Sequence, residues 1–436
     1  MRNLITYLIF LGLGFSVPLF AQTELSLEEC IQRALEHSPP ELGIAQLEQE
    51  TSEIELKQQK LAYLPSLDLY GSGGMYVGRR IDPITNTFPT SAVFSNYYGL
   101  NLAVPVFSGL NQKYNIQQSR TQATINALNV VQSEKNNTRE VIQYYYNVLD
   151  FEIAKSIHED KIEQLNTEMD RVSQLIREER LTILDSLNIL AQIDQVRLDL
   201  LEVDKQLATF KESLSVLIGS DPESIQLVLP DTSAHLMPEL NLVGNRSTEQ
   251  LRLETEGLEI EQRRAKFFYL PEVQLFGAFG SGYSSNNLDF SNTPPTVKPY
   301  GLQVRENLFQ NVGVSLSMPL FNKTSNLKSI QTAAIRLKIQ EERKRLLERQ
   351  TTQRKNALSR EWTQLTSSIE INKRLMNYAE IAFEAAKSLN EEQRITRFEL
   401  NATRNEYYSA QLNYQRDLLR QSLFRDQLTY DVFEVE

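Results

Sequence analysis

The sequence predicts a mainly α-helical chain with four β-strands, built as two tandem copies of one plan. Two observations lead to this fold class: a short motif occurs twice, and a long segment free of proline and glycine follows each occurrence. The motif Tyr63-Leu64-Pro65 returns as Tyr269-Leu270-Pro271. In both places a charged run with helical periodicity stops at the proline, and alternation of apolar residues begins behind it. Each copy therefore passes from a helix to a strand at the same point.

Each copy ends in a long segment that favours continuous helix. Between Pro105 and Pro222 the only glycines are Gly109 and Gly219, and after Pro319 the chain contains neither proline nor glycine. Both segments are rich in Gln, Glu, Arg, Leu and Ala, which have high helix propensity. We therefore expect each segment to be helical almost throughout.

The N-terminal residues have the features of a secretory signal peptide. Arg2 supplies a positive charge, an apolar run follows, and the small residue Ala21 precedes the expected cleavage site. The apolar run is shorter than the ~20 residues that a membrane-spanning helix needs. We therefore expect residues 1–21 to be removed on export.

The charge and cysteine content limit the classes of function. The net charge of −11 disfavours nucleic acid as a partner. Cys30 is the only cysteine, so no intrachain disulfide can form, and a buried thiol on a short helix is its expected role. An exported chain without a transmembrane helix is either a soluble periplasmic protein or an outer-membrane β-barrel.

The first copy, residues 22–218, is expected to begin with helices and to continue into a β-hairpin over 66–106. A polar, proline-containing loop joins the two strands. A long helical hairpin over 108–218 follows. Residues 219–245 contain three prolines and a short strand-like run, so they are predicted to form a strap between the copies.

The second copy, residues 246–436, repeats this order. It is predicted to contain one helix, a β-hairpin over 272–320 and a long helical hairpin over 322–434. The connection between its strands, about 284–310, is polar and contains three prolines, so it is predicted to be a loop.

The strands are predicted to have one apolar face and one small or polar face. The apolar face carries Leu67, Leu69, Leu100, Leu102, Val104, Leu275, Val312, Val314 and Leu316. The opposite face carries Gly99, Ala103, Gly313, Ser315 and Ser317. Such alternation is typical of strands between lipid and a wet lumen, although a half-buried strand of a soluble sandwich alternates in the same way.

The helical hairpins are predicted to be coiled coils of unequal regularity. In the first copy, apolar residues recur at spacings of three and four, which is an a/d heptad seam. The descending arm has Ile193, Val196, Leu200, Val203, Leu207, Phe210, Leu214 and Leu217, and the ascending arm has Leu165, Met169, Val172 and Ile176. The corresponding seam of the second copy is less regular, because Asp417 and Gln421 follow its aromatic residues.

A turn must divide each long helical segment. In the first copy the helical pattern breaks before Thr182, which is expected to cap the next helix together with Asp185. In the second copy Thr396 and Glu399 occupy the same places.

Four strands per chain cannot close a barrel by themselves. An open sheet edge cannot face lipid, because its backbone groups would remain unsatisfied. Two chains would supply eight strands and a filled barrel, whereas three would supply twelve and a lumen; the small residues on the polar face favour the wider barrel. Helices of roughly 100 Å would extend such a barrel into a tunnel.

With these features the chain resembles the TolC-like outer-membrane efflux proteins over essentially its whole length. The resemblance rests on the run from Leu27 to Pro39, the Tyr-Leu-Pro doublet, the strand ends Val104-Pro105-Val106-Phe107 and Met318-Pro319-Leu320-Phe321, and the two hairpin turns. The order and duplication of these motifs make it specific.

The resemblance implies a homotrimer in the cell outer membrane that extends into the periplasm. Its twelve-stranded transmembrane β-barrel would continue into an α-helical coiled-coil tunnel with an equatorial collar. It implies a passive exit duct of a tripartite efflux or type I secretion system. The partners would be a periplasmic adaptor, an inner-membrane RND or ABC transporter and the lipid of the outer membrane.

The resemblance also implies a periplasmic gate at the hairpin turns. The family's first acidic gate residue corresponds to Glu399, with Asp185 as its counterpart in the first copy, and mutual repulsion among six such carboxylates is expected to raise some of their pKa values. The second acidic position falls on Ala402, with Asn188 in the first copy, so the acidic ring is thinner. Acids in the first turn of a helix also have a purely structural explanation, because they interact favourably with the helix dipole.

Further site residues are implied at both ends of the helices. The adaptor-docking tips are Arg180, Leu181, Thr182, Arg394, Ile395 and Thr396, for which surface solvation is the alternative. Arg177, Arg394 and Arg397 are further candidates, which would pair with neighbouring acids and hold the gate shut. The junctions between helix and barrel are Pro65, Pro105, Pro271 and Pro319.

No motif in the sequence indicates an enzyme, a metal site or a cofactor. His37, His158 and His235 lack ligand spacing, and no phosphate-binding loop or nucleophile elbow is present. The tyrosines at 144–146 are expected to pack between helices. The rival hypothesis is a secreted coiled-coil structural or adhesive protein with a soluble β-layer. The cargo stays open, with drugs, metal ions, lipids and polypeptides as candidates.

Overall fold

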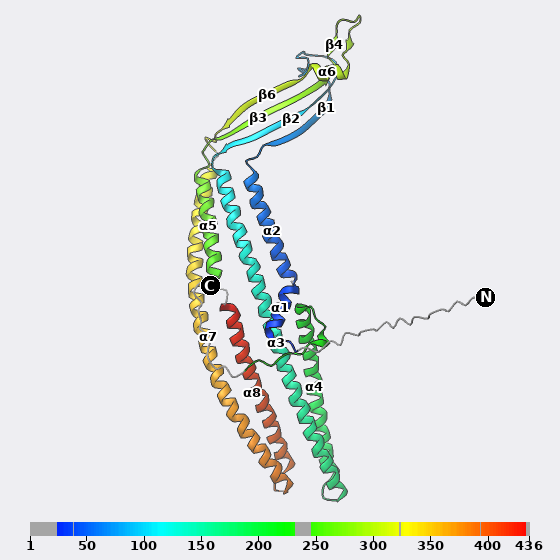
Figure 1. Ribbon diagram of the computed structural model, residues 1–436, viewed down its shortest axis with the longest axis vertical. Helices are drawn as coiled ribbons and strands as arrows, with labels where there is room; N and C mark the ends of the chain where they lie inside the picture. The colour runs from blue at the N-terminus through cyan, green and yellow to red at the C-terminus, as the bar shows by residue number, and fades with distance from the viewer. Residues whose placement is uncertain (1–23, 38, 232–245, 322–323, 393, 433–436) are drawn as a thin grey trace, which may run out of the picture.

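The molecule is long and narrow, with a β-sheet at one end and paired helices extending from it (Figure 1). This computed structural model describes residues 24–37, 39–231, 246–321, 324–392 and 394–432. The predicted signal peptide, residues 1–21, lies outside the described residues, as does the second part of the predicted strap. Among the residues that the structure describes, no helix is both long enough and apolar enough to cross a membrane.

The first half of the chain follows the predicted order of elements. They are α1 (Leu27–His37), α2 (Pro40–Leu61), β1 (Ser66–Tyr76), β2 (Val93–Ser108), α3 (Asn111–Arg177), α4 (Ile183–Ile218) and the short 3₁₀ helix η1 (Pro222–Ser224). Helix α3 has 67 residues and α4 has 36. At 1.5 Å per residue, α3 is about 100 Å long.

The second half has one helix before its first long strand and three additional short elements between its two long strands. Its elements are α5 (Arg246–Lys266), β3 (Glu272–Ser284), β4 (Leu288–Asp289), β5 (Thr296–Val297), α6 (Tyr300–Glu306), β6 (Phe309–Ser317), α7 (Ser325–Glu391) and α8 (Arg397–Val432). Helices α7 and α8 have 67 and 36 residues, the lengths of α3 and α4. The connection predicted as a loop contains the β4–β5 hairpin and α6, because Pro299 sets the backbone for a helix start and the polar turns pair locally.

The four long strands form one antiparallel sheet in the order β1-β2-β3-β6. The register places Leu69 opposite Leu100, Leu100 opposite Phe279, and Leu275 opposite Val314. The predicted apolar side chains therefore share one face of the sheet, where most are exposed. Among the strands that the structure describes, β1 and β6 are the two edges of the sheet, and each has one side without a paired strand.

The small residues on the polar face do not leave empty space beside them. A Cβ atom on Gly280 would lie 2.6 Å from the Phe309 ring, and one on Gly313 would lie 2.5 Å from the Phe276 ring. Aromatic side chains thus lie across the glycines of neighbouring strands. The polar face is bulkier than the small residues of the sequence suggested.

The largest apolar core lies midway along the molecule, where α1, α3, α4 and α8 meet. Tyr145 and Tyr146 are buried in it, and their hydroxyls donate to Val228 O and to Asp426 Oδ2, both at 2.5 Å. The packing role predicted for these tyrosines is confirmed, and the lone thiol of Cys30 is buried in the same core.

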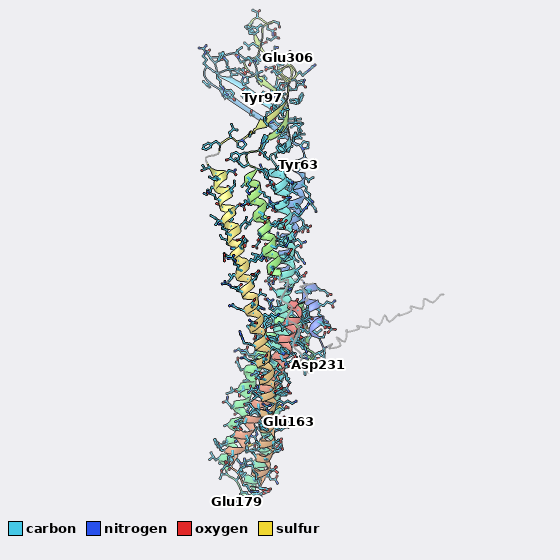
Figure 2. The ribbon with its side chains drawn as sticks, turned by 90° about the vertical axis from the view of Figure 1, so that its left-hand side faces the viewer. Tyr63, Tyr97, Glu163, Glu179, Asp231 and Glu306 are labelled. Carbon is cyan, nitrogen blue, oxygen red and sulfur yellow. The ribbon has the colours of Figure 1, made fainter. Side chains whose placement is uncertain are left out.

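The strap meets the N-terminal segment at this core. Leu25 and Leu227 form an isolated parallel β-bridge, with Leu25 N donating to Gln226 O at 2.7 Å. Within the described residues, the strand-like run predicted here is therefore reduced to one bridge, because its β-pairing is limited to the short segment around Leu25. Figure 2 places Asp231, just beyond this bridge, below the middle of the molecule on the side of the helical tips.

Candidate gate at the helical tips

Both helical hairpins turn at the end of the molecule farthest from the sheet (Figure 1). The first turn lies between α3 and α4 and the second between α7 and α8. Glu179 in the first turn adopts a positive φ of 57°, which reverses the chain direction directly after α3. Glu179 marks this tip in Figure 2.

Asp185 fixes the start of α4. Its carboxylate accepts hydrogen bonds from the Thr182 N–H at 3.0 Å and from the Thr182 hydroxyl at 2.9 Å. Partial burial acts to raise the pKa of Asp185, but these hydrogen bonds and the Arg397 guanidinium together lower it below its ordinary value. The carboxylate is therefore charged and already engaged at neutral pH.

Glu399 has the equivalent position at the start of α8. Its carboxylate accepts from the Thr396 N–H at 2.8 Å and from the Thr396 hydroxyl at 2.9 Å, and the Glu399 N–H donates back to that hydroxyl at 3.3 Å. The hydrogen bonds from Thr396 lower the pKa of Glu399. Both predicted gate acids thus cap helices, and the repulsion expected among six carboxylates stays a prediction about the assembled channel.

Charged side chains connect the two hairpins just behind the turns. Arg397 of α8 lies 3.8 Å from Asp185 of α4 and 3.8 Å from Glu168 of α3. Arg404, about two helical turns after Arg397 on α8, also pairs with Glu168. The Arg404 side chain is only 5% exposed and that of Glu168 13%, so this pair is largely shielded from water.

Polar contacts between the hairpins lie on both sides of this pair. Nearer the tips, Arg171 of α3 donates to Glu391, the last residue of α7, at 2.7 Å. Towards the core, Arg416 of α8 donates to Asp150 of α3 at 2.9 Å. The two hairpins therefore meet through charged groups from the tips up to the central core.

A cavity of about 950 Å³ lies between the hairpins behind these contacts. Acidic and basic side chains line it in equal number: Asp160, Glu163, Glu168, Asp185 and Glu391 against Arg171, Arg180, Lys387, Arg397 and Arg404. Figure 2 places Glu163 closer to the middle of the molecule than the tip residue Glu179. The space is polar and lies where the two hairpins would separate.

Some donors at this cavity lack an acceptor. Arg397 Nη1, Arg404 Nε and the Tyr408 hydroxyl are buried without a hydrogen-bond partner among the residues that the structure describes. Burial raises the pKa of Tyr408 to about 12, so the hydroxyl stays protonated. Such unsatisfied groups cost free energy, which makes this arrangement less stable than a fully paired interface.

The predicted docking tips divide into exposed and partly buried residues. Arg180 and Arg394 are exposed and pair within their own turns, with Glu178 at 3.9 Å and Glu392 at 3.4 Å. Thr182 and Thr396 are exposed at the turns and make the cap contacts described above. Leu181 and Ile395 instead pack partly against the apolar clusters of the two coils.

Sequence reasoning missed exposed apolar residues beside the tips. Ile183, Leu184 and Phe398 follow the two turns, and Phe398 is 82% exposed. Their signal was present in the sequence, because each is an apolar residue in the first turn of a helix where the seam has not begun. Large exposed apolar side chains at a tip indicate a contact surface.

The four junction prolines lie in two kinds of place. Pro65 and Pro271 stand directly before β1 and β3, a few residues after α2 and α5 end. Pro105 lies inside β2, at a bulge in its pairing with β3, and β2 continues to Ser108. Pro319 follows the end of β6.

The fold matches solved structures along nearly its whole length. The outer membrane protein VceC from Vibrio cholerae superposes with a TM-score of 0.72 and 15% identity, covering 94% of this chain and 95% of that one. The CmeC outer membrane channel of Campylobacter jejuni gives 0.73 and 13%, covering 94% and 85%. The open state of the MtrE outer membrane channel of Neisseria gonorrhoeae gives 0.71 and 15%, covering 93% and 88%.

Sequence comparison points to the same kind of protein. Residues 30–220 match the family model of the outer membrane efflux proteins. The chain is therefore similar to the outer membrane efflux proteins in sequence over these residues and in fold over nearly its whole length. No curated protein matches the sequence.

The sequence match and the shared fold together confirm several predictions. The chain is an exit duct of the outer membrane and not an enzyme. The predicted location in the outer membrane is confirmed with it.

Proposed function

We propose that three copies of this efflux protein assemble into one continuous duct, with a twelve-stranded barrel in the outer membrane and a helical tunnel below it. The observation that carries the proposal is that the sheet has two open edges. Among the described strands, β1 and β6 each lack a partner on one side. In the assembly, β6 of one chain would pair with β1 of the next. Three chains are preferred to two because twelve strands leave a lumen and eight do not.

Exposed apolar stripes on the helices support the same assembly. Helix α7 forms one flank, and α2 and α4 form the opposite one (Figure 1). On α7 the exposed residues are Ile335, Ile339, Leu346, Ile371, Leu375, Tyr378 and Ile381. On α2 and α4 they are Ile44, Leu47, Ile54, Leu61, Leu187, Leu190, Leu198 and Leu201. Opposite flanks that are both apolar favour a head-to-tail ring, in which α7 packs against the neighbour's α2 and α4.

The closed gate would be held by the charged contacts between the hairpins. Arg397 joins Asp185 and Glu168, and Arg404 joins Glu168. Breaking these contacts would let the tip of α7 and α8 move away from α3 and α4. In the trimer Asp185 and Glu399 would line the narrowest part of the tunnel and favour cations.

Opening and transport would depend on partners. We infer a periplasmic adaptor that contacts the tips and an inner-membrane RND or ABC transporter that supplies the energy. The exposed residues Arg180 and Arg394, with Phe398 beside them, offer charge and apolar surface for the adaptor. The duct itself would conduct passively, as part of a tripartite efflux or type I secretion system.

The chain organisation supports two tandem repeats, residues 22–218 and 246–436, joined by a strap over 219–245. The equal lengths of α3 and α7, and of α4 and α8, support this division. Residues 1–21 would direct export and be removed. The duplication explains how one chain supplies two hairpins to the barrel and two coils to the tunnel.

The test of assembly is oligomeric state together with conductance. Protein extracted from outer membranes in detergent is expected to sediment as a trimer and to form channels in planar lipid bilayers. Ile339→Glu on the apolar flank of α7 should dissociate the trimer, because it buries a charge against the neighbouring chain. Lys344→Glu is the matched control, because Lys344 is exposed on a different side of the same helix. Recovery of the native chain as a soluble monomer would overturn the proposal and favour the secreted coiled-coil protein.

A further inference from the structure

We propose that the barrel wall carries a binding belt for organic cations with an aromatic or apolar body, formed by Tyr70, Tyr97 and Phe309 with Asp68 beside them. The inference rests on the proposed trimeric barrel, because it takes the polar face of the sheet as the lumen. It names a class of cargo that the duct would retain on its way out.

The three rings lie together on the polar face of the sheet. The register aligns Tyr70 with Gly99, Gly99 with Gly280, and Gly280 with Phe309, so one row crosses all four strands. Tyr97 lies between the two aromatic ends of this row, with its ring centroid 6.1 Å from that of Tyr70 and 5.3 Å from that of Phe309. Figure 2 shows Tyr97 within the sheet.

Glycines allow the rings to lie against the wall. A Cβ on Gly99 would lie 2.8 Å from the Tyr70 hydroxyl, and a Cβ on Gly280 would lie 2.6 Å from the Phe309 ring. Side chains at these two positions would push the rings away from the strands. The aromatic surface is thus continuous across β1 to β6, and the unpaired edges would bring Phe309 of one chain towards Tyr70 of the next.

The negative charge of the polar face favours a positively charged ligand. Among the described strand residues that share the polar face, Asp68 and Glu272 are the charged ones, and both are acidic. Asp68 precedes Tyr70 by two residues on β1, so their side chains leave the same face about 7 Å apart. A ring surface next to carboxylates attracts a cation with an apolar body and repels an anion of the same shape.

The chain itself places a cation on an aromatic ring of this face. The Arg80 guanidinium lies 4.6 Å above the centroid of Tyr76, which is on the polar face at the outer end of β1. A cation–π contact therefore already forms here with the protein's own side chain. The belt rings lie further along the same wall and have no such partner among the described cation–π contacts.

The experiment measures block of single channels in planar bilayers by tetraphenylphosphonium, a cation with aromatic rings. Potassium current through the trimer is expected to be blocked by tetraphenylphosphonium and not by tetraphenylborate, the anion of the same shape. Tyr97→Ala and Phe309→Ala should each weaken block about tenfold, because one cation–π contact contributes about 1–2 kcal/mol. Asp68→Asn should also weaken block relative to the native channel, because it removes a carboxylate and leaves the rings unchanged.

The matched control is Tyr98→Ala, which removes the neighbouring tyrosine of β2 on the opposite face and should leave block unchanged. Tyr97→Leu preserves apolar volume over the glycines and separates loss of the π face from loss of wall packing. Equal block by both ions, or block unchanged in Tyr97→Ala, Tyr97→Leu and Phe309→Ala, would overturn the belt. Failure of the assembly proposal would look different, because no trimer and no potassium current would then be observed.

Discussion

The two helical hairpins have the same lengths but different interiors. In the first, Leu165, Val172, Ile189, Ile193 and Val196 form an apolar cluster near the turn, and α3 and α4 meet again in the central core. In the second, apolar contact between α7 and α8 is limited to a small cluster around Trp362 and another around Phe383. Between these clusters, Asp417 accepts hydrogen bonds from Ser368 at 2.5 Å and Asn372 at 2.7 Å.

This difference assigns separate mechanical roles to the hairpins. The larger apolar clusters between α3 and α4 disfavour any shifted register, so the first hairpin is a fixed support. A polar seam depends on specific hydrogen bonds, which water can replace when the helices shift. The second hairpin is therefore the one whose position depends on its charged contacts with the first, and the predictions below separate the two roles.

The largest effect is expected from Arg404→Ala. Removing this guanidinium leaves Glu168 largely buried with only the distant Arg397, which costs about 3–5 kcal/mol in the closed state. Single-channel conductance in planar bilayers should rise several-fold. Arg420→Ala is the control on the same helix, because Arg420 is exposed and lies 4.0 Å from its partner Asp417. An Arg404→Ala channel with native conductance would contradict the proposal that the Arg404–Glu168 pair holds the gate closed.

Leu165→Ala tests the support hairpin. Leu165 is fully buried in the α3–α4 seam, so truncation is expected to lower stability by about 2–5 kcal/mol. Calorimetry should report an earlier unfolding transition, while the conductance of the folded trimer stays native. Asn166→Ala is the control, because Asn166 is the exposed neighbour of Leu165. This change should alter neither the unfolding transition nor the conductance. If Leu165→Ala opened the channel as strongly as Arg404→Ala, the two hairpins would not have separate roles.

A smaller effect is expected from the double variant Asp185→Ala with Glu399→Ala. Both carboxylates accept hydrogen bonds that fix the starts of α4 and α8, so losing them is expected to lower thermal stability slightly. The same change removes negative charge from the proposed constriction, so permeability to cations relative to anions should fall. Reversal-potential measurements check the selectivity. The control is Asp170→Ala, which removes an exposed acid on α3 away from the turns and should leave the selectivity unchanged. Native selectivity together with reduced thermal stability would leave these acids with a capping role alone.

The smallest effect is expected from acidification. The pKa of Asp185 is lowered below its ordinary value of 3.8, so its pairing with Arg397 stabilises the closed gate fully above that pH and is lost as the pH falls further. Conductance should stay constant from neutral pH down to about pH 4 and rise below it. A rise already at about pH 6 would point to a histidine instead of this carboxylate.

Most of the fold was predictable because it depends on local patterns. The repeated Tyr-Leu-Pro motif located both passages from helix to strand. The absence of proline and glycine from the long segments predicted how far their helices extend. Helix α6 was missed because its seven residues are too few for periodicity to show. The aromatic rings over Gly99 and Gly280 were missed because strand register, and not alternation alone, brings them together.

The site was predictable only in part. Thr182 with Asp185, and Thr396 with Glu399, follow the capping pattern, so the turns were found from sequence. Glu168 and Arg404 were not found, because their pairing depends on how α3 packs against α8. A signal existed at Arg404, which occupies a position at seam spacing after Leu400 where an apolar residue would be expected.

A double-mutant cycle on Glu168 and Arg404, measured as single-channel conductance, tests the central claim most directly. If these residues form the lock between a fixed hairpin and a movable one, Glu168→Ala and Arg404→Ala each open the channel. The double variant should then be no more open than the more open single variant, which corresponds to a coupling free energy of about 1–3 kcal/mol. Additive effects, or three channels that all conduct like the native trimer, would contradict it.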